Sequence, residues 1–344
     1  MILAGDIGGT TTRLAWFEAS GGPLRRTFVG DYPSRDYAGL EAIVREFVDT
    51  HRHALDHAAF GIAGPVRAGR VVTTNLPWTV EVDGLAAALR VGAVSLLNDV
   101  EANAYGIAVL HPGDFAVLNA GDANPCGNMA VIAAGTGLGE AGAVWDGQRL
   151  LPFACEGGHA DFAPRDPVEM ELLEHLRQRF GHVSWERVVS GPGLCNIYGF
   201  LRDSGRGTEQ SWVRERMQEG DAAAAIARAA SAGQCELCSQ ALDRLVSLYA
   251  AEAGNLALKL MATGGVHLGG GIAPKILDAL RGPAFMRSFA AKGRMRDLLE
   301  AMPVRVILND DAALLGAARY AALKAGLADP AAVAAAAPDG REDA

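Results

Sequence analysis

The chain has 344 residues, a formal net charge of −9, and 50% apolar against 21% charged residues. This composition suffices for a large buried core, excludes a mostly disordered chain, and corresponds to about two domains. The acidic balance argues against a nucleic-acid-binding protein, which normally presents a basic face. An anionic ligand would therefore be held locally, by backbone N–H groups, helix ends or a metal ion.

The sequence contains no apolar stretch long enough to span a membrane, and its amino terminus lacks the basic and apolar regions of a secretory signal. Five cysteines form no disulfide framework and fit reduced thiols in a cytoplasm. Cys235 and Cys238 make a C-x-x-C inside a long helical pattern. No second ligand pair lies nearby, so we interpret them as two thiols on a helix face rather than a zinc site.

The first third of the chain alternates strand and helix signals. Residues 1–19 predict strand, glycine turn and strand, and 27–33 could add a third strand. Apolar residues at helical spacing follow within 36–55. Residues 58–66 are a short apolar run that ends in Gly-Pro, and 94–110 predict a strand, a polar tip and a helix.

The same pattern then begins again. Strands are expected at 115–121 and 128–145, the latter broken by a second glycine turn. Helices are expected at 167–180, at 191–203 and, longest, at 221–261. A strand, a glycine cluster and a helix start occupy 262–280, and a last strand and helix end near residue 326.

Two halves that each open with strands around a glycine turn indicate a duplicated α/β unit with a cleft between the halves. We expect the last strand and helix to return to the first domain. The expected domains are therefore 1–109 plus 304–327 and 110–303, with 328–344 as a flexible tail.

The first glycine turn is a candidate phosphate-binding loop. Adjacent glycines let a ligand approach the backbone closely, and successive N–H groups form an anion nest. A carboxylate beside a phosphate is repulsive unless a cation lies between them, so Asp6 suggests Mg²⁺, held through water. An ordinary glycine-rich hairpin is the alternative. The candidate residues are Gly5, Asp6, Ile7, Gly8, Gly9 and Thr10.

Two further glycine clusters have the same chemistry. Gly135, Thr136 and Gly137 form a turn at the equivalent place in the second half, and two such turns could grip a polyphosphate from both sides. Gly270 and Gly271 precede a helix start, where an adenine or a phosphate could bind. Hairpin geometry and tight strand–helix packing are the respective alternatives.

Asn98 and Asp99 lie at the tip of an apolar strand, directly before a helix. Strand-end loops are where catalytic groups lie in such folds. An aspartate there can accept the proton of a hydroxyl group as that hydroxyl attacks phosphorus. Alternatively, Asp99 only caps the helix that begins at Glu101.

A third polar set consists of Glu156 and His159 in the segment EGGH, with Glu186 further on. Carboxylates and imidazoles can hydrogen-bond the neighbouring hydroxyls of a sugar. His159 can also be an ordinary loop histidine or a zinc ligand with Cys155, although further ligands are missing nearby. Glu186 taken alone is typical of a surface residue.

With these residues in view, the chain resembles the bacterial glucokinase family of the proteobacterial type over about residues 1–325. The matching stretches include GDIGGTTTRLA, GIAGPV, TNLPW, LLNDVEANAYGI, AAGTGLGEA, EGGHADFAPRD, ERVVSGPGLCNIY and GGVHLGGGIAPKIL. The resemblance implies the duplicated ribonuclease-H-like fold of the actin and hexokinase ATPases. It also implies a cytoplasmic homodimer that phosphorylates D-glucose to glucose 6-phosphate in glycolysis.

The resemblance also implies residue roles. The turn from Gly5 to Thr10 looks like the ATP-phosphate loop and Asp99 like the base for the sugar 6-hydroxyl. Asn98, Glu156, His159 and Glu186 look like ligands of the glucose hydroxyls. The resemblance implies ATP and Mg²⁺ as cofactors. The related ROK proteins carry a cysteine-rich zinc motif after the E-x-G-H segment. That motif is absent here, so we predict no zinc.

The second glycine turn reads AAGTGLGEA where the family more often has Pro or Gly before GTGLG and an apolar residue after it. The segment NDV also differs from the more usual NDF. A kinase for another hexose or amino sugar remains an alternative function. A non-catalytic sugar sensor or a filament-forming ATPase on the same fold is an alternative of a different class.

Overall fold

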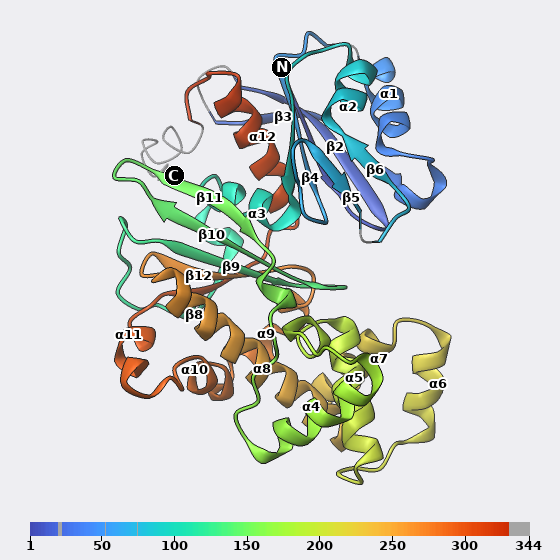
Figure 1. Cartoon of the computed structure of the whole chain (residues 1–344), viewed down its shortest axis with the longest axis vertical. Helices are drawn as coiled ribbons and strands as arrows, with labels where there is room; N and C mark the ends of the chain where they lie inside the picture. The colour runs from blue at the N-terminus through green and yellow to red at the C-terminus, as the bar shows by residue number, and fades with distance from the viewer. Residues whose placement is uncertain (20–22, 52, 74, 330–344) are drawn as a thin grey trace, which may run out of the picture. The chain divides into compact units, whose positions relative to one another are not determined.

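The structure is a computed structural model that describes residues 1–19, 23–51, 53–73 and 75–329. The chain divides into two compact units, which are shown in Figure 1. Unit 1 comprises Met1–Asp114 and the chain from Asn309 onwards, and unit 2 comprises Phe115–Leu308. The expected flexible tail at 328–344 falls, from residue 330 on, outside the described residues. No helix of the described chain is long and apolar enough to cross a membrane.

Unit 1 is built on a five-stranded mixed sheet with the strand order β3-β2-β1-β4-β7. β1 pairs antiparallel with β2 and parallel with β4. The strands are β1 (Ile2–Ile7), β2 (Thr11–Glu18), β3 (Arg25–Pro33), β4 (His57–Ile62) and β7 (Val94–Asn98), with a separate hairpin of β5 (Arg70–Val72) and β6 (Thr79–Glu81). The helices are α1 (Leu40–Thr50), α2 (Val82–Leu89), α3 (Asp99–Ile107) and α12 (Ala312–Lys324).

Helices cover both faces of this sheet (Figure 1). Side chains alternate along β1, so Leu3 and Ile7 join a core with α1 and α2, whereas Ile2 and Ala4 join a core with α12. A strand that is buried on both faces is expected to be continuously apolar. Asp6 is the charged exception in β1, which marks the carboxyl end of this strand as a site of function.

The helices α3 and α12 cross at two glycines. A Cβ atom at Gly316 would overlap the carbonyl oxygen of Ala102, and one at Gly106 would overlap that of Ala312. Because glycine has no side chain, the two backbones approach more closely than ordinary helix packing allows. The crossing fixes α3, whose first residue is Asp99.

Unit 2 contains a six-stranded sheet with the order β11-β10-β9-β12-β13-β8. Its strands are β8 (Phe115–Asn119), β9 (Met129–Ala134), β10 (Leu138–Trp145), β11 (Leu150–Cys155), β12 (Gly265–Gly269) and β13 (Val304–Ile307). Its α-helices are α4 (Pro167–Phe180), α5 (Gly191–Asp203), α6 (Ser211–Glu219), α7 (Ala222–Ser231), α8 (Glu236–Leu260), α9 (Leu277–Arg281), α10 (Pro283–Phe289) and α11 (Arg296–Glu300). Short 3-10 turns include η3 (Gly157–His159) and η4 (Trp185–Arg187).

The first five strands of the second sheet repeat the first sheet. β11-β10-β9-β12-β13 has the order of β3-β2-β1-β4-β7, and in both sheets the first two pairings are antiparallel and the next two parallel. β8 is an additional antiparallel edge strand. This repetition is the duplicated α/β fold expected from the two glycine turns.

Two sequence expectations about the fold were wrong. The strand expected to return to the first domain, β13, instead pairs with β12 and β8 in unit 2. Its apolar residues complete the second sheet, so only the helix after it belongs to unit 1 and the division falls after Leu308. The second division falls after Asp114 rather than after residue 109, because the turn at Pro112–Asp114 still belongs to unit 1.

A further expectation was also wrong: the single long helix predicted at 221–261 is two helices, α7 and α8. A turn at Gly233, with a φ of +63°, separates α7 from α8. Cys235 is therefore not on a helix face but caps α8, because its sulfur accepts a hydrogen bond from the N–H of Cys238. Both thiols are buried in the core of unit 2.

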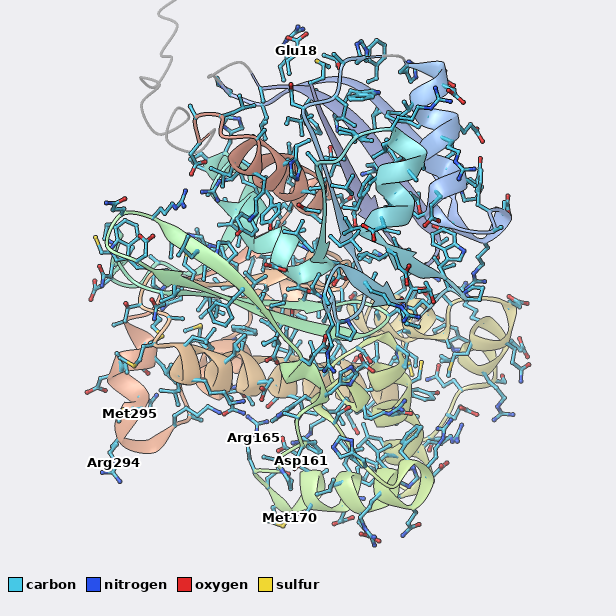
Figure 2. The ribbon with its side chains drawn as sticks, turned by 45° about the horizontal axis from the view of Figure 1, so that its top comes forward. Glu18, Asp161, Arg165, Met170, Arg294 and Met295 are labelled. Carbon is cyan, nitrogen blue, oxygen red and sulfur yellow. The ribbon has the colours of Figure 1, made fainter. Side chains whose placement is uncertain are left out.

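The helix α4 is held to α8 by a buried ion pair. Arg165, which is labelled in Figure 2, donates to the carboxylate of Glu169 at 2.6 Å and to the hydroxyl of Ser247 at 2.9 Å. Arg244 of α8 reaches the same carboxylate at 3.1 Å. Glu169 is fully buried, so its charge has to be paired in this way.

Candidate functional site

The first glycine turn joins β1 to β2, and its carbonyl groups are occupied from within unit 1. The buried Ser34 donates its hydroxyl to the carbonyl of Gly8 at 2.8 Å and its N–H to that of Thr10 at 2.9 Å. The N–H of Gly8 donates to Thr11. Among the described residues, nothing accepts from the N–H of Gly9 or Thr10. The turn therefore offers two adjacent donors to an anion.

The residues predicted for this loop differ in what they do. Gly5 and Ile7 are buried within β1, so they shape the strand that carries the turn rather than supply its donors. At Gly9 a Cβ atom would lie 2.7 Å from the Cβ of Asn75, so this position requires glycine. The ligand-facing part of the loop is consequently shorter than the predicted segment.

Asp6 lies beside other carboxylates. Burial, reinforced by Asp99 and Asp311, raises its pKa to about 7, whereas Arg13 opposes the shift. Arg13 lies directly across from Asp6 in the β1–β2 register and is itself held by Asp31 at 2.7 Å and Asp311 at 2.8 Å. Hard oxygen ligands with excess negative charge fit Mg²⁺. The described residues contain no ready-made group of three or more metal-binding side chains.

Asn98 and Asp99 end β7 and begin α3. The side-chain oxygen of Asn98 accepts from the N–H groups of Val100 at 2.9 Å and Glu101 at 3.3 Å, so Asn98 is the helix cap. Asp99 is the first helical residue and accepts from the N–H of Val100 at 3.0 Å. The alternative that Asp99 is only the cap is therefore wrong, because Asn98 takes that role.

The use of Asn98 as a cap limits what it can offer a sugar. Its amide nitrogen donates one hydrogen to the carbonyl of Gly64 at 3.3 Å. An amide has a second hydrogen, so one donor remains for a hydroxyl group.

In unit 2 the second glycine turn joins β9 to β10. Gly135 donates to the carbonyl of Gly137 at 2.8 Å, and its own carbonyl accepts from Gly191 at the start of α5, also at 2.8 Å. The N–H groups of Thr136 and Gly137 have no acceptor within the described residues. This turn thus repeats the pair of donors that the first turn provides.

The third glycine cluster contacts the strand end that leads into the second turn. Gly270 has a φ of +76°, and a Cβ atom there would collide with the carbonyl group of Ala134. The same carbonyl accepts from the N–H of Ile272 at 3.1 Å. The second and third glycine clusters therefore lie together within unit 2, a grouping that the sequence did not predict.

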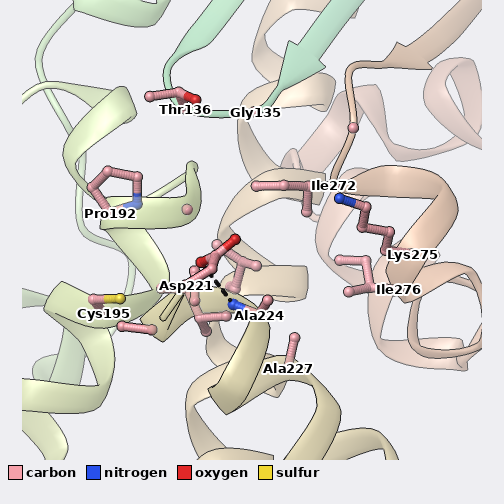
Figure 3. Close-up of a pocket in the computed structure, with 16 residues that line it drawn as sticks. Gly135, Thr136, Pro192, Cys195, Asp221, Ala224, Ala227, Ile272, Lys275 and Ile276 are labelled. Atoms are coloured by element: carbon pink, nitrogen blue, oxygen red, sulfur yellow. Dashed lines mark hydrogen bonds between the residues drawn. The ribbon is translucent and has the colours of Figure 1, made fainter. Parts of the chain in front are cut away.

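Both clusters border a cavity of about 600 Å³ (Figure 3). One side is formed by Pro192 and Cys195 of α5 and the other by Ile272, Lys275 and Ile276. Its floor is alanine-rich and comes from the start of α7, which Asp221 caps through the N–H of Ala224 at 3.1 Å. The cavity is therefore mostly apolar with a few charged groups.

The segment EGGH rests on β10. A Cβ atom at Gly158 would overlap the carbonyl oxygen of Leu138, so the glycines let η3 lie against this strand. Glu156 and His159 flank the contact, and their side chains are about half exposed, at 50% and 57%, with Oε2 and Nε2 3.9 Å apart. Two hydrogen-bonding side chains thus project side by side from one short turn.

Glu186 joins the same strand from η4. Its carboxylate accepts from the N–H of Leu138 at 3.1 Å, directly after the second glycine turn. At Gly137 a Cβ atom would lie 2.6 Å from this carboxylate. Glu186 is thus half-buried and fixed in position, unlike the surface residue that its sequence context suggested.

The start of α5 and the residues Asp221 and Lys275 were not predicted as site residues. Ser190 caps α5 through the N–H of Gly193 at 3.0 Å. The sequence Ser-Gly-Pro is a recognisable helix start, so this signal was available. Asp221 and Lys275 had no such signal, because the cavity they line exists only after distant helices pack together.

Comparisons with known proteins agree with this geometry. A family model described as Glucokinase matches residues 3–324. A glucokinase of Synechocystis sp. is 43% identical, with 93% of this chain and 97% of that protein covered. One of Nostoc sp. is 42% identical, with coverages of 94% and 99%. The crystal structure of a glucokinase from an Antarctic psychrotroph superposes with a TM-score of 0.79 at 32% identity, covering 92% and 97% of the two chains.

Proposed function

This chain belongs to the glucokinase family and phosphorylates glucose with ATP, and we propose that Asp99 is the base of that reaction. Asp99 would accept the proton of the sugar 6-hydroxyl as this oxygen attacks the γ-phosphorus, giving glucose 6-phosphate. The position of Asp99 at the carboxyl end of β7 and the assignment of capping to Asn98 support this role.

The observation that carries the proposal for unit 2 is the position of β10. This strand begins in a glycine turn that lines the cavity, binds Glu186 through its first N–H, and lies beneath the turn with Glu156 and His159. The strand β10 therefore connects the glycine turn proposed to bind phosphate with Glu156, His159 and Glu186, whose side chains are suited to sugar hydroxyls. We propose Glu156, His159 and Glu186, with Asn98 of unit 1, as the ligands of glucose.

The cavity of unit 2 is proposed as the site of the nucleoside of ATP. Its alanine-rich floor fits a flat base, and the N–H groups of Thr136 and Gly137 fit a phosphate. Gly270 and Gly271 allow the chain to turn closely at its edge. The donors at Gly9 and Thr10 of unit 1 are proposed to bind phosphate as well.

Asp6 would hold Mg²⁺, through water, because its carboxylate lies among excess negative charge. When bound, the ion neutralises charge on the phosphate oxygens. The loose transition state of phosphoryl transfer leaves little covalent chemistry to the protein. The residues named here consequently act by orienting the two substrates and by accepting one proton.

The remaining properties implied by the family stay predictions. We propose a cytoplasmic homodimer that acts in glycolysis and contains no zinc. Sedimentation would measure the oligomeric state, and elemental analysis of the purified protein would detect zinc.

The proposal for Asp99 is tested by ADP release from Mg-ATP with and without glucose. Asp99→Asn should lower kcat by about 10³-fold while the KM for ATP stays within a few-fold, since only the proton acceptor is removed. Asp49→Asn, an exposed carboxylate of α1, is the matched control and should behave like the parent protein. Turnover of Asp99→Asn within tenfold of the parent protein would refute the role.

A further inference from the structure

Glu140 is an acidic residue in the interior of unit 2 that the proposed reaction does not use. It lies on β10, two residues beyond Leu138, and only 1% of its surface is exposed. Neither carboxyl oxygen accepts a hydrogen bond from an N–H or hydroxyl group of the described residues. Burying a carboxylate without hydrogen-bond donors costs free energy of folding. We therefore consider which neighbouring groups interact with Glu140.

The first neighbour of Glu140 is the turn that carries the proposed sugar ligands. A Cβ atom at Gly157 would overlap the carboxyl of Glu140, so this carboxyl lies directly against the backbone of η3. The neighbouring Gly158 lies against the backbone carbonyl of Leu138 on the same strand. The side chain of Glu140 and the backbone of Leu138 thus both contact the turn that carries Glu156 and His159.

The second neighbour is Glu252 of α8, which is fully buried and whose charge, after burial itself, raises the pKa of Glu140. Like both carboxyl oxygens of Glu140, Oε1 of Glu252 has no hydrogen-bond partner among the described residues. Two neighbouring buried carboxyl groups repel when both are ionised, so the arrangement favours one shared proton. Glu252 also accepts from the amide of Asn255 at 2.7 Å and lies 3.6 Å from the ammonium of Lys259. These two partners hold the carboxyl of Glu252 in place.

We propose that Glu140 is a positioning residue for glucose binding: the acid pair that it forms with Glu252 holds the turn Glu156–His159 in its binding position. This inference rests on the proposed role of Glu156 and His159 as sugar ligands. With a shared proton, the two carboxyls attract each other and Glu140 stays beneath Gly157. Without it, two buried negative charges repel, and the backbone of η3, against which the carboxyl of Glu140 lies, is displaced.

The proton balance of the pair agrees with the geometry. Burial, reinforced by the charge of Glu252, raises the pKa of Glu140 to about 8, and burial also raises that of Glu252. The pair therefore retains one proton at neutral pH and loses it in mildly alkaline solution.

The other groups around the pair come from three elements. Lys259 and Tyr249 face it from α8, and Cys155 faces it from β11. Lys292, which follows α10, donates to Ala251 and Asn255. Burial raises the pKa of both Tyr249 and Cys155, so neither ionises in the range where the pair does. Burial lowers the pKa of Lys292 to about 8, so the experiment has to separate Lys292 from Glu140.

The test is the dissociation constant of glucose, measured by calorimetry from pH 7 to 9.5 on the full chain without ATP. If binding requires the shared proton, the constant for the parent protein should rise by about tenfold between pH 7 and 9. Glu140→Gln keeps the shape and can donate a hydrogen bond to Glu252 at every pH. This variant should bind glucose within about threefold of the parent at pH 7 and show no alkaline rise.

Glu252→Gln is the second variant and should also remove the rise, because it leaves Glu140 with a permanent partner. Glu215→Gln, an exposed residue of α6, changes the net charge equally and should retain the rise. A rise that persists in both Glu140→Gln and Glu252→Gln would assign it to Lys292 and overturn the inference, as would a flat profile in the parent protein. Absence of glucose binding in the parent at any pH would instead refute the proposed function, so the two failures are distinguishable.

Discussion

The two glycine turns occupy equivalent places in the two sheets but have different surroundings. Each leaves two adjacent N–H groups without an acceptor among the described residues, at Gly9 and Thr10 in unit 1 and at Thr136 and Gly137 in unit 2. The first lies beside Asp6, and the second lies between a mostly apolar cavity and Glu186. The duplicated backbone therefore supplies the anion-binding geometry twice, and the side chains around each copy decide its chemistry.

This difference suggests a division of labour between the units. Unit 1 contains Asp6, whose pKa is raised by burial and by the charges of Asp99 and Asp311 and which is the proposed Mg²⁺ ligand. Unit 2 contains the cavity proposed for the nucleoside and the half-exposed side chains of Glu156 and His159, which are proposed to bind the sugar. Four predictions test this division, beginning with the largest expected effect.

Replacing Asp6 beside the first turn and Asp221 in the cavity that the second turn borders should have unequal consequences. Asp6→Asn should lower kcat by at least about a hundredfold, because charge neutralisation at the phosphates is lost. The kcat of Asp221→Asn should stay within about threefold of that of the parent protein, since asparagine caps a helix as well as aspartate does. Steady-state kinetics at saturating glucose and varied Mg²⁺ measures both. Equal losses in the two variants would contradict the division of labour.

A glycine-to-alanine substitution should destabilise the crossing of α3 and α12 in unit 1 more than a helix of unit 2 whose glycine has free space beside it. Gly316→Ala places a Cβ atom on the carbonyl oxygen of Ala102 and should cost about 1–3 kcal/mol of stability. It should also lower kcat, because α3 begins at Asp99. The matched variant Gly199→Ala lies in α5 with nothing within 4 Å of its Cβ and should be neutral or stabilising. Urea unfolding measures both, and equal stability of the two variants would show that the crossing tolerates a methyl group.

The acid pair of unit 2 should make stability depend on pH. The pKa of Glu140 rises from 4.5 to about 8 on folding, so between these values the folded chain holds a proton that the unfolded chain has released. The free energy of unfolding should therefore decrease as the pH rises from about 5 to 8. Glu140→Gln should reduce this decrease, as measured by urea unfolding at pH 6 and 8.5, whereas Glu215→Gln should not.

The smallest expected effect concerns the cation at the cavity. Lys275→Met should raise the KM for ATP by about three- to tenfold and leave the KM for glucose unchanged, because an exposed ammonium contributes only modestly to binding a phosphate. Arg281→Met, an exposed cation on α9, is the control. A larger change in the KM for glucose than in that for ATP would contradict the proposed nucleoside site.

Short sequence signals were sufficient for much of this protein. Glycines after an apolar strand predict a tight turn, and this was correct both between β1 and β2 and between β9 and β10. At Gly9 the contact with Asn75 leaves room for no other residue. Periodicity located α4 and α5. It did not separate α7 from α8, because one left-handed glycine at position 233 interrupts a composition that is otherwise uniformly helical.

Candidate site residues could also be recognised in the sequence where a residue type is suited to a particular chemistry. Asp99 after an apolar strand and Glu156 beside His159 were identified as candidates from the chain alone. Their alternatives were not separable in the sequence, since Asn98 and Asp99 are both good helix caps. Only the hydrogen bonds of Asn98 to Val100 and Glu101 assigned the capping role.

The sequence by itself thus determined the repeated strand–turn–strand units and the glycine turns within them, because these depend on neighbours along the chain. It also supplied the candidate site residues, which stay predictions. Tertiary structure decided the assignment of β13 to the second sheet, the anchoring of Glu186 on Leu138, and the cavity beside Lys275. It also placed Glu140 against Glu252 and Gly157. These arrangements join residues far apart in the chain, and their energies arise from burial and pairing that no local pattern encodes.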